Sequence, residues 1–222
     1  GTQTNKWVVG TAANNGGTKS LYISNDNGAT NSYTINAGST VHAYRDVVIP
    51  ATATSLNLAF DWRSIGETND NIRVYLIPVS VIPTPGTAIT ANATNLKINA
   101  TNLFNGTSWA TFNGVINVSG MGGTPRRLVF EWVNNTFTGS QQPAAIDNIN
   151  RTVITCPAPS NPAVVAGTLT PTQVNINWTV PTSVPPQYDY YINTTGVTPI
   201  GTTAPTGQSA TTTATNIAVT PS

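Results

Sequence analysis

The stretch SLNLAFDWRS, residues 55–64, alternates apolar and polar side chains along almost its whole length. One face carries Leu56, Leu58, Phe60 and Trp62, and the opposite face carries Asn57, Asp61 and Arg63. A period of two residues is that of a β-strand, in which successive side chains point to opposite faces of the sheet. The pattern therefore predicts a strand with one face in a hydrophobic core and the other in water.

Four further stretches have the same character. Each is rich in β-branched and aromatic residues, which favour strands. They are SLYIS (20–24), NIRVYLIPV (71–79), RRLVFEWVN (126–134) and VNINWTV (174–180). The segments between them carry Gly, Asn, Asp and Pro, the residues of tight turns, and no window has the 3.6-residue period of a helix. We therefore predict an all-β protein of antiparallel sheets stacked as sandwiches.

The composition predicts a polar but almost uncharged surface. Hydrophobic residues make up 39% of the 222 positions, enough for a real core. Asp, Glu, Lys and Arg make up only 8%, against about 25% in typical domains. With a net charge of +1 and no Lys/Arg run, the chain is not predicted to bind nucleic acid or anionic lipid. No apolar stretch approaches the roughly 20 residues of a membrane helix, so no membrane insertion is predicted either.

A domain boundary is predicted at Cys156, the only cysteine. The preceding AAIDNINRTVI (144–154) alternates like a last strand, whereas PAPSNP (157–162) has the composition of a stiff, extended linker. Downstream the chain is richer in Thr and Pro, and Asp189 is its only charged residue. We therefore place the first domain at 1–155 and the second at 156–222.

Catalytic chemistry finds little support, and no enzyme is predicted. The one histidine, His42 in STVHAYRD, has no nucleophile motif such as G-x-S-x-G near it, so we interpret it as a strand residue. One Cys and one His cannot make a four-ligand zinc site. Carboxylates for glycoside hydrolysis exist at Glu67, Asp70 and Glu131. We expect the charged residues of FDWRSIGETNDNIRV (60–74) to pair with one another instead, namely Arg63, Glu67, Asp70 and Arg73.

Calcium is the one predicted cofactor, in a structural role. It takes six to eight oxygen ligands, which loops rich in Asp and Asn can supply. The candidate ligands are Asn25 and Asp26 in SNDNG (24–28), and Asp147 and Asn148 in AIDNI (145–149). The alternative for SNDNG is an Asx turn at the end of a hairpin. The alternative for Asp147 is a buried carboxylate satisfied by backbone N–H groups or by an arginine.

Carbohydrate is a second ligand class to consider. Sugar sites place an exposed aromatic ring against the apolar side of a pyranose and use Asn and Asp for its hydroxyl groups. The candidates are Trp7, Trp109 and Tyr191. Trp62, Trp132 and Trp178 lie in alternating strands and are interpreted as core, and Trp109 could also point inward.

The first domain resembles a known family in several ordered motifs. These are WVVG (7–10), LYISNDNG (21–28), AYRDVVIP (43–50), FDWRSIGE (60–67), RRLVFEWVN (126–134) and PAAIDNI (143–149). They resemble the jelly-roll module of secreted surface adhesins of gliding bacteria, a distant relative of the MAM and concanavalin-like sandwiches. In such modules a structural cation can be held by an acidic residue of the closing strand, and Asp147 occupies the matching position.

The second domain is similar to a bacterial fibronectin type III domain. The similarity lies in CPAPSNP (156–162), VNINWTVP (174–181), YDYYINTTGVTP (188–199) and TATNIAVTP (213–221). Such domains take about 85 to 100 residues and seven strands, so the last strands are expected to be missing. The resemblance implies that Cys156 forms a disulfide with a residue outside this chain; the alternative is a free thiol. The 222 residues are then a window on a longer polypeptide, and the signal of an exported protein would lie outside these residues or have been removed.

Together these features predict a non-catalytic structural or adhesive module of a large extracellular, cell-surface assembly. Its partners would be neighbouring domains or subunits of that assembly, and glycans are a further candidate. The resemblance also implies export by a type IX system and a role in gliding or filaments. One alternative is a carbohydrate-binding module of a secreted enzyme. Another is a self-assembling fibre subunit, whose open sheet edges accept a strand from a neighbour.

Overall fold

The chain consists of strands and loops in the residues that its structure describes. The structure is a computed structural model, and it describes residues 3–155, 159–180, 187–192, 204–210 and 213–218. Within these ranges no helix is present, and hence none that is long and apolar enough to cross a membrane. The prediction of an all-β protein is confirmed. The chain divides into two compact units, Gly1–Ile154 and Thr155–Ser222.

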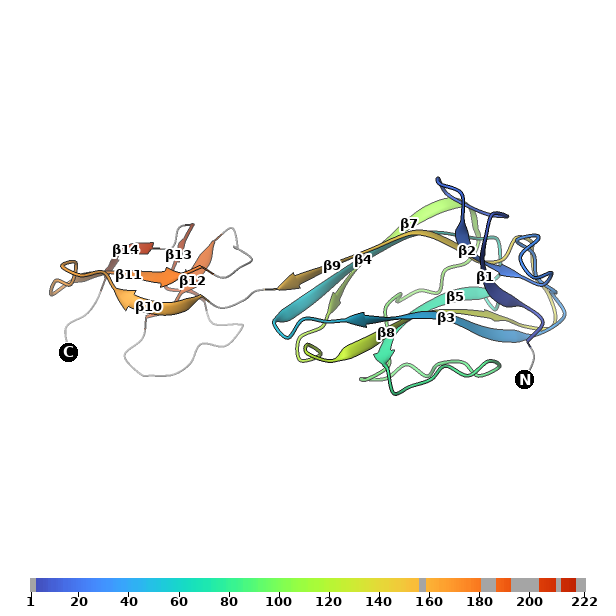
Figure 1. The fold of residues 1–222 in the computed structure, drawn as a ribbon, viewed down its shortest axis with the longest axis horizontal. Coiled ribbons are helices and arrows are strands. Elements are labelled where there is room, and N and C mark those ends of the chain that lie inside the picture. Colours follow the sequence, from blue (N-terminus) through green and yellow to red (C-terminus); the bar gives the residue numbers. More distant parts are fainter. Residues whose placement is uncertain (1–2, 156–158, 181–186, 193–203, 211–212, 219–222) are drawn as a thin grey trace. The chain divides into compact units, whose positions relative to one another are not determined.

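The strands of the first unit form two sheets (Figure 1). In chain order the strands are β1 (Lys6–Gly10), β2 (Ser20–Ser24), β3 (Ser39–Val48), β4 (Ala53–Ser64), β5 (Asn71–Pro78), β6 (Leu96–Lys97), β7 (Gly106–Asn117), β8 (Pro125–Asn134) and β9 (Ala145–Thr155). One sheet has the order β1-β2-β9-β4-β7, and the other has the order β3-β8-β5-β6.

The pairing between these strands is nested like that of one long hairpin. β2 pairs with β9, β3 with β8, β4 with β7 and β5 with β6, all antiparallel. Wrapping such a hairpin around a core places successive pairs alternately in the two sheets, which is the jelly-roll arrangement. The first unit is therefore the predicted jelly-roll sandwich, with β1 added at one edge.

The alternating face of β4 builds the core between the sheets. Leu56, Leu58 and Phe60 are at most 1% exposed, and Trp62 packs against the same core. From the opposite sheet, Phe130 meets Phe60 edge to face with ring centroids 5.2 Å apart. Full burial of one such side chain contributes about 1.5–3 kcal/mol, so this apolar layer holds the two sheets together.

The ion pairs predicted around the turn after β4 do not form, so that prediction was wrong. Asp70 is fully buried and accepts hydrogen bonds from Tyr33 Oη (2.6 Å) and from the backbone N–H of Asn135 (2.9 Å). Arg73 is paired in register with Glu131 across β5 and β8, with 3.5 Å between Nη1 and Oε1. The other two members bond elsewhere, Arg63 to Asn31 and Glu67 to Thr138. The sheet register, rather than proximity along the chain, chooses these partners.

A left-handed residue in β9 changes which of its side chains face between the sheets. Ile146 and Val153 both pack into the core, although a regular strand would place residues at this odd spacing on opposite faces. Asn148 lies between them with a φ of 49°, and an extra residue of this kind is what a β-bulge supplies. Ile149 and Arg151 consequently face the same side of β9 as Val153.

The second unit contains shorter strands in its described residues. They are β10 (Ser160–Val164), β11 (Gln173–Thr179), β12 (Tyr188–Tyr190), β13 (Gly207–Ser209) and β14 (Thr213–Ala218), in the sheets β10-β11-β14 and β12-β13. Trp178 packs against Val174 and meets the ring of Tyr188 at 5.1 Å. Cys156 lies outside the described residues, so its disulfide stays a prediction.

Candidate binding groove

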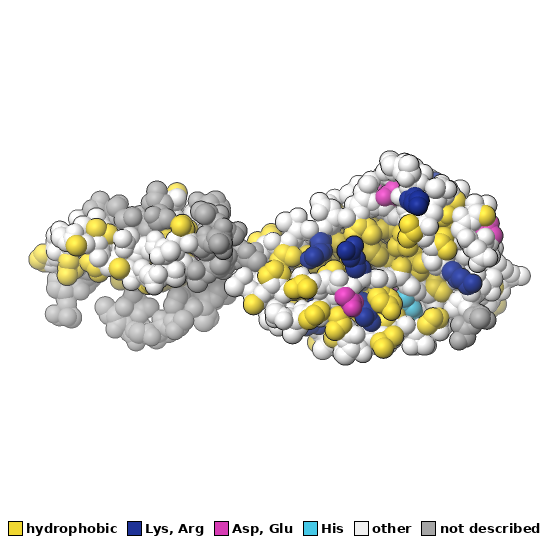
Figure 2. All heavy atoms as spheres, viewed as in Figure 1, with side chains coloured by type: hydrophobic (Ala, Val, Ile, Leu, Met, Phe, Trp, Pro, Cys, Tyr) yellow, Lys and Arg dark blue, Asp and Glu magenta, His cyan; other side chains and the backbone are white. Residues whose placement is uncertain are grey.

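A groove of about 810 Å³ opens on one side of the first unit. It lies between β3, the last strand of its sheet, and residues of β1, β2 and β9 from the other sheet. Figure 2 shows this face of the unit, where hydrophobic side chains gather around a few Lys and Arg side chains. The core layer of the sandwich is thus reachable from this side.

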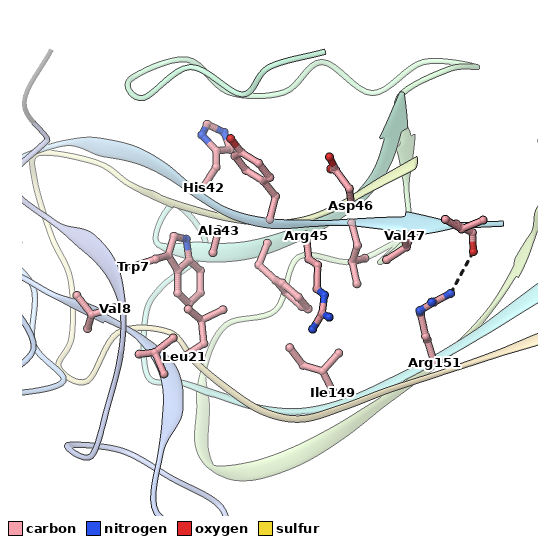
Figure 3. Close-up of a pocket in the computed structure, with 15 residues that line it drawn as sticks. Trp7, Val8, Leu21, His42, Ala43, Arg45, Asp46, Val47, Ile149 and Arg151 are labelled. Carbon is pink, nitrogen blue, oxygen red and sulfur yellow. Dashed lines mark hydrogen bonds between the residues drawn. The ribbon is translucent and has the colours of Figure 1, made fainter. Parts of the chain in front are cut away.

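The base of the groove is apolar and partly aromatic. Leu21 of β2, Phe130 of β8 and Ile149 of β9 contribute side chains to it. Trp7 of β1 closes one end, because its indole Nε1–H donates to the carbonyl oxygen of Val41 at 3.1 Å. Figure 3 shows Trp7, Leu21 and Ile149 on the side of the groove opposite β3. A base of this kind offers an occupant apolar area together with a fixed aromatic edge.

The backbone of β3 has a free edge along this groove. Thr40 accepts a hydrogen bond from Gly86 N (2.8 Å), and Val48 accepts one from Arg151 Nη1 (3.4 Å), so both residues direct backbone groups away from β8. In an antiparallel ladder this outward direction recurs at every second residue. His42, Tyr44 and Asp46 therefore direct their N–H and C=O groups outward, and β3 is the outermost strand of its sheet.

The charges at the groove are unbalanced in favour of cations. Arg45 points into the groove (Figure 3) and has no hydrogen-bond or ion-pair partner among the described residues. Arg151 points toward β3 from the opposite wall, where the Val48 carbonyl is its one hydrogen-bond partner in the part of the chain that the structure describes. Asp46 is the one Asp or Glu of the lining; its side chain lies on the same face of β3 as His42 (Figure 3), where Arg127 holds it bidentately at 2.7 and 3.0 Å.

Arg127 also fixes the rim of the groove. Its hydrogen bonds to Asp46 lower the pKa of that carboxyl group, and the same bonds raise the pKa of Arg127. The guanidinium lies over the ring of Tyr44, 4.2 Å from the ring centroid. Asp46 is therefore ion-paired with a residue of the neighbouring strand β8, and the guanidinium groups of Arg45 and Arg151 remain to bind an anionic group.

His42 belongs to β3, but its side chain lies on the other face of that strand (Figure 3). The side chain of His42 is 2% exposed, and its Nε2 lies 2.9 Å from Glu131 Oε2. The same carboxylate oxygen accepts a hydrogen bond from the backbone N–H of Ile89 at 2.7 Å. His42 is a strand residue, as the sequence predicted, and its imidazole does not reach the groove.

The predicted calcium ligands of β9 lie in a hydrogen-bonded cluster that also contains Asp61. Asp147 accepts from the backbone N–H groups of Asn15 (2.7 Å) and Asn148 (2.8 Å). Asp61 accepts from Asn148 Nδ2 (2.8 Å), Thr111 Oγ1 (2.6 Å) and Asn15 Nδ2 (2.8 Å), and these bonds lower its pKa. Since N–H groups point at both carboxylates, this arrangement satisfies them without a cation. The calcium site here stays a prediction.

The other predicted calcium loop is organised by its own hydroxyl groups. Asp26 accepts hydrogen bonds from Ser24 Oγ (2.6 Å) and from Thr30 through both N (3.0 Å) and Oγ1 (2.6 Å). These bonds lower the pKa of Asp26 to about 2. Asn25 bonds Thr34 and Ser32 instead. In the described residues no group of three His, Cys, Asp or Glu side chains is placed to hold a metal ion.

Trp7 and Trp109, the two predicted sugar-site aromatics of the first unit, do not come together. Trp7 lies at the end of the groove, half-buried against the core. Trp109 of β7 lies on the outer face of the five-stranded sheet, under the guanidinium of Arg63 at 5.4 Å. Tyr191 belongs to the second unit. The stacked pair of exposed rings typical of a sugar platform is therefore not made by Trp7 and Trp109.

A smaller hollow of about 220 Å³ lies on the outer face of that same sheet. Its polar lining comes from β4, β7 and β9, namely Asn57, Asn113, Asn150 and Thr152. Asn57 Oδ1 is buried there without a hydrogen-bond partner among the described residues. Amide and hydroxyl groups of this kind suit a neutral, hydroxyl-rich ligand.

Sequence reasoning identified Trp7 but missed the rest of the groove. The sequence did not predict Arg45, Ile149 and Arg151 as site residues. The groove depends on which strands lie at sheet edges, and this is set by pairing between distant strands. One signal was available in AAIDNINRTVI (144–154): Ile146 and Ile149 are an odd number of residues apart, and Asn148 between them tolerates a left-handed conformation. That combination indicates a bulge.

Comparison with known proteins assigns no family. No protein-family profile and no curated protein sequence matches the chain. Among solved structures it is similar to the enzymatically active domain of tailspike protein 4 from bacteriophage CBA120, with 16% identity and a TM-score of 0.40 over 69% of this chain and 18% of that one. It is also similar to the glycoside hydrolase domain of Endo-D from Streptococcus pneumoniae R6, with 12% identity and a TM-score of 0.37 over 100% of this chain and 31% of that one. At this distance neither likeness bears on function.

Proposed function

We propose that this chain is a non-catalytic adhesive module of an extracellular assembly, and that the groove beside β3 is its binding surface. The observation that carries the proposal is one groove of about 810 Å³ that combines an apolar base, a free strand edge and two guanidinium groups with no carboxylate partner among the described residues. Ligand sites in proteins are usually concave, with a mostly apolar lining and a few polar groups at fixed positions. Its partners would be neighbouring subunits or domains of that assembly.

The chemistry of the groove supports binding rather than catalysis. Its lining includes one carboxylate, Asp46, which Arg127 already holds. The imidazole of His42 is bonded to Glu131 on the other face of β3. General acid–base catalysis needs a titratable group within hydrogen-bond reach of a bound substrate, and these two groups do not supply one.

The extracellular setting is proposed from the composition. A surface with only 8% charged residues and abundant Thr and Asn stays hydrated largely without charge. Outside the groove, the contacts of this surface should then depend little on ionic strength. This property suits an exposed surface protein, and it accords with the resemblance to surface adhesins.

Adhesion by beads that carry the full chain tests the proposed function. Ile149 lines the groove and is 48% exposed, whereas Ile154 of the same strand is 40% exposed and lies outside the groove. Ile149→Lys should reduce bead adhesion to cells of the source organism at least tenfold, while the matched Ile154→Lys should change it less than twofold. Equal effects of the two variants, or no adhesion by wild-type beads, would contradict the proposal.

Carbohydrate binding is the second candidate, and the amide-lined hollow on the outer face of the five-stranded sheet favours it. A glycan array probed with the wild-type chain and with Asn113→Ala tests this candidate, because Asn113 lines that hollow. If the wild-type chain binds particular glycans, Asn113→Ala abolishes that binding and Ile149→Lys preserves it, the binding site lies on this outer face and not in the groove.

A further inference from the structure

We propose that the groove receives an extended peptide segment, which pairs with the free edge of β3 as an added strand and places an acidic side chain between Arg45 and Arg151. This inference rests on the proposed function and names the partner of the same site. The occupant is a segment of another protein with alternating apolar and acidic residues.

The free edge of β3 is long enough to specify such a partner. From Val41 to Val48 the strand extends over about 23 Å at roughly 3.3 Å per residue. Over this length His42, Tyr44 and Asp46 direct backbone donors and acceptors outward, as argued above from Thr40 and Val48. Soluble proteins commonly cover or interrupt an edge of this length. Among the described residues, the hydrogen bonds to this edge lie at its two ends, at Thr40 and Val48, and leave the middle open.

The groove supplies the side-chain contacts that an added strand needs. Side chains on one face of that strand would lie over Ala43 and against Leu21 and Ile149 of the opposite wall. Trp7 is anchored to Val41 and sets one end of the contact. Backbone pairing gives strand addition its affinity, and pockets for alternate side chains give it specificity.

The charges select the chemistry of the occupant. Arg45 has no partner among the described residues, and the Arg151 guanidinium is bonded to one carbonyl oxygen. Guanidinium groups bind carboxylates through paired, charge-assisted hydrogen bonds. Because Asp46 is already paired with Arg127, the carboxylate that satisfies Arg45 and Arg151 would come from the partner.

Selection from a display library of random decapeptides on the immobilised full chain provides the probe. The strongest selected peptide is then synthesised, and its Kd is measured by fluorescence anisotropy. Tyr44→Pro removes an outward N–H group without touching a hydrogen bond to β8, and Tyr44→Thr controls for the side chain. We expect selection of alternating apolar and acidic peptides, a Kd at least tenfold higher for Tyr44→Pro, and a change below threefold for Tyr44→Thr.

Two further measurements keep the test independent of how Tyr44→Pro folds. N-methylation of the peptide backbone at alternate positions should abolish binding in one register and be tolerated in the other. Arg45→Glu should weaken binding at least tenfold, and a peptide with its acidic residues changed to Arg should restore it. Failure to select any peptide, equal effects of the two methylation registers, or no effect of Arg45→Glu would overturn the proposal.

Other outcomes would separate this inference from the proposed function. If Ile149→Lys abolishes bead adhesion but Tyr44→Pro and Arg45→Glu do not, the groove binds its partner by another route, and strand addition is refuted while the proposed function stands. Dimerisation of the wild-type chain in sedimentation experiments that Tyr44→Pro abolishes would identify a second copy as the occupant, and would overturn the acidic-peptide assignment.

Discussion

At the scale of single residues, the buried carboxylate of Asp70 holds the loop after β8 against Tyr33 and the start of β5. Asp70 and Tyr33 are at most 2% exposed, and Asp70 bonds both the Tyr33 hydroxyl and the backbone of Asn135. Burial raises the pKa of Asp70. Gly139 in the same loop approaches Tyr33 Oη and Asp70 Oδ2 so closely that a Cβ at this position would force these side chains to move.

Removal of the Asp70 carboxylate should therefore destabilise the first unit more than removal of its Tyr33 donor. Asp70→Ala leaves a buried hydroxyl and a backbone N–H without an acceptor, and should lower the free energy of unfolding by about 2–4 kcal/mol. Tyr33→Phe removes one hydrogen bond and should lower it by about 1 kcal/mol. Urea denaturation of both variants measures the difference, and a larger loss for Tyr33→Phe would refute this assignment.

The pH dependence of stability should reveal Asp26. Its pKa is about 2 in the folded chain, below the ordinary aspartate value of about 3.9. A depressed pKa contributes stability that is present above about pH 4 and is lost as the pH falls toward 2. Asp26→Asn should therefore flatten the pH dependence of the unfolding free energy between pH 4 and 2. Carbon NMR should show the Asp26 carboxyl group titrating near pH 2, and an ordinary titration near pH 4 would count against the hydrogen-bonded loop.

At the scale of elements, the strands could be predicted from sequence and the groove could not. The run at 55–64 became β4 (53–64), and the run at 126–134 became β8 (125–134), because alternation with β-branched and aromatic residues reports burial locally. Edge positions depend on pairing between distant strands, such as β3 with β8. The partners of Arg63, Asp70 and Arg73 were mispredicted for the same reason.

The bulge at Asn148 is the local feature that directs the side chains of Ile149 and Arg151 into the groove. Substitutions of Asn148 test it directly. Asn148→Gly retains the left-handed conformation and loses the side-chain bonds to Asp61 and Asn15. Asn148→Ala loses the same bonds and must also adopt an unfavourable φ. We expect Asn148→Ala to melt at a lower temperature than Asn148→Gly, with about 1 kcal/mol between them. Equal stabilities would show that the backbone at this residue is not strained.

At the scale of the whole molecule, the two units should fold independently. Their internal contacts separate at Ile154 and Thr155, one residue before the boundary predicted at Cys156, and the large core belongs to the first unit. Residues 1–155 expressed alone should therefore melt cooperatively, within a few degrees of the corresponding transition of the full chain. Failure of this fragment to fold would show that the first unit depends on the rest of the chain.

The central claim is that a partner segment lies along the free edge of β3. Amide hydrogen exchange of the full chain, measured with and without the selected decapeptide, tests this claim most directly. The account predicts slowed exchange at the outward amides of His42, Tyr44 and Asp46 on binding. The amides of Ala43 and Arg45, already bonded toward β8, should change little. Protection at Asn57 and Asn113 on the outer face of the other sheet, with none at β3, would contradict the account.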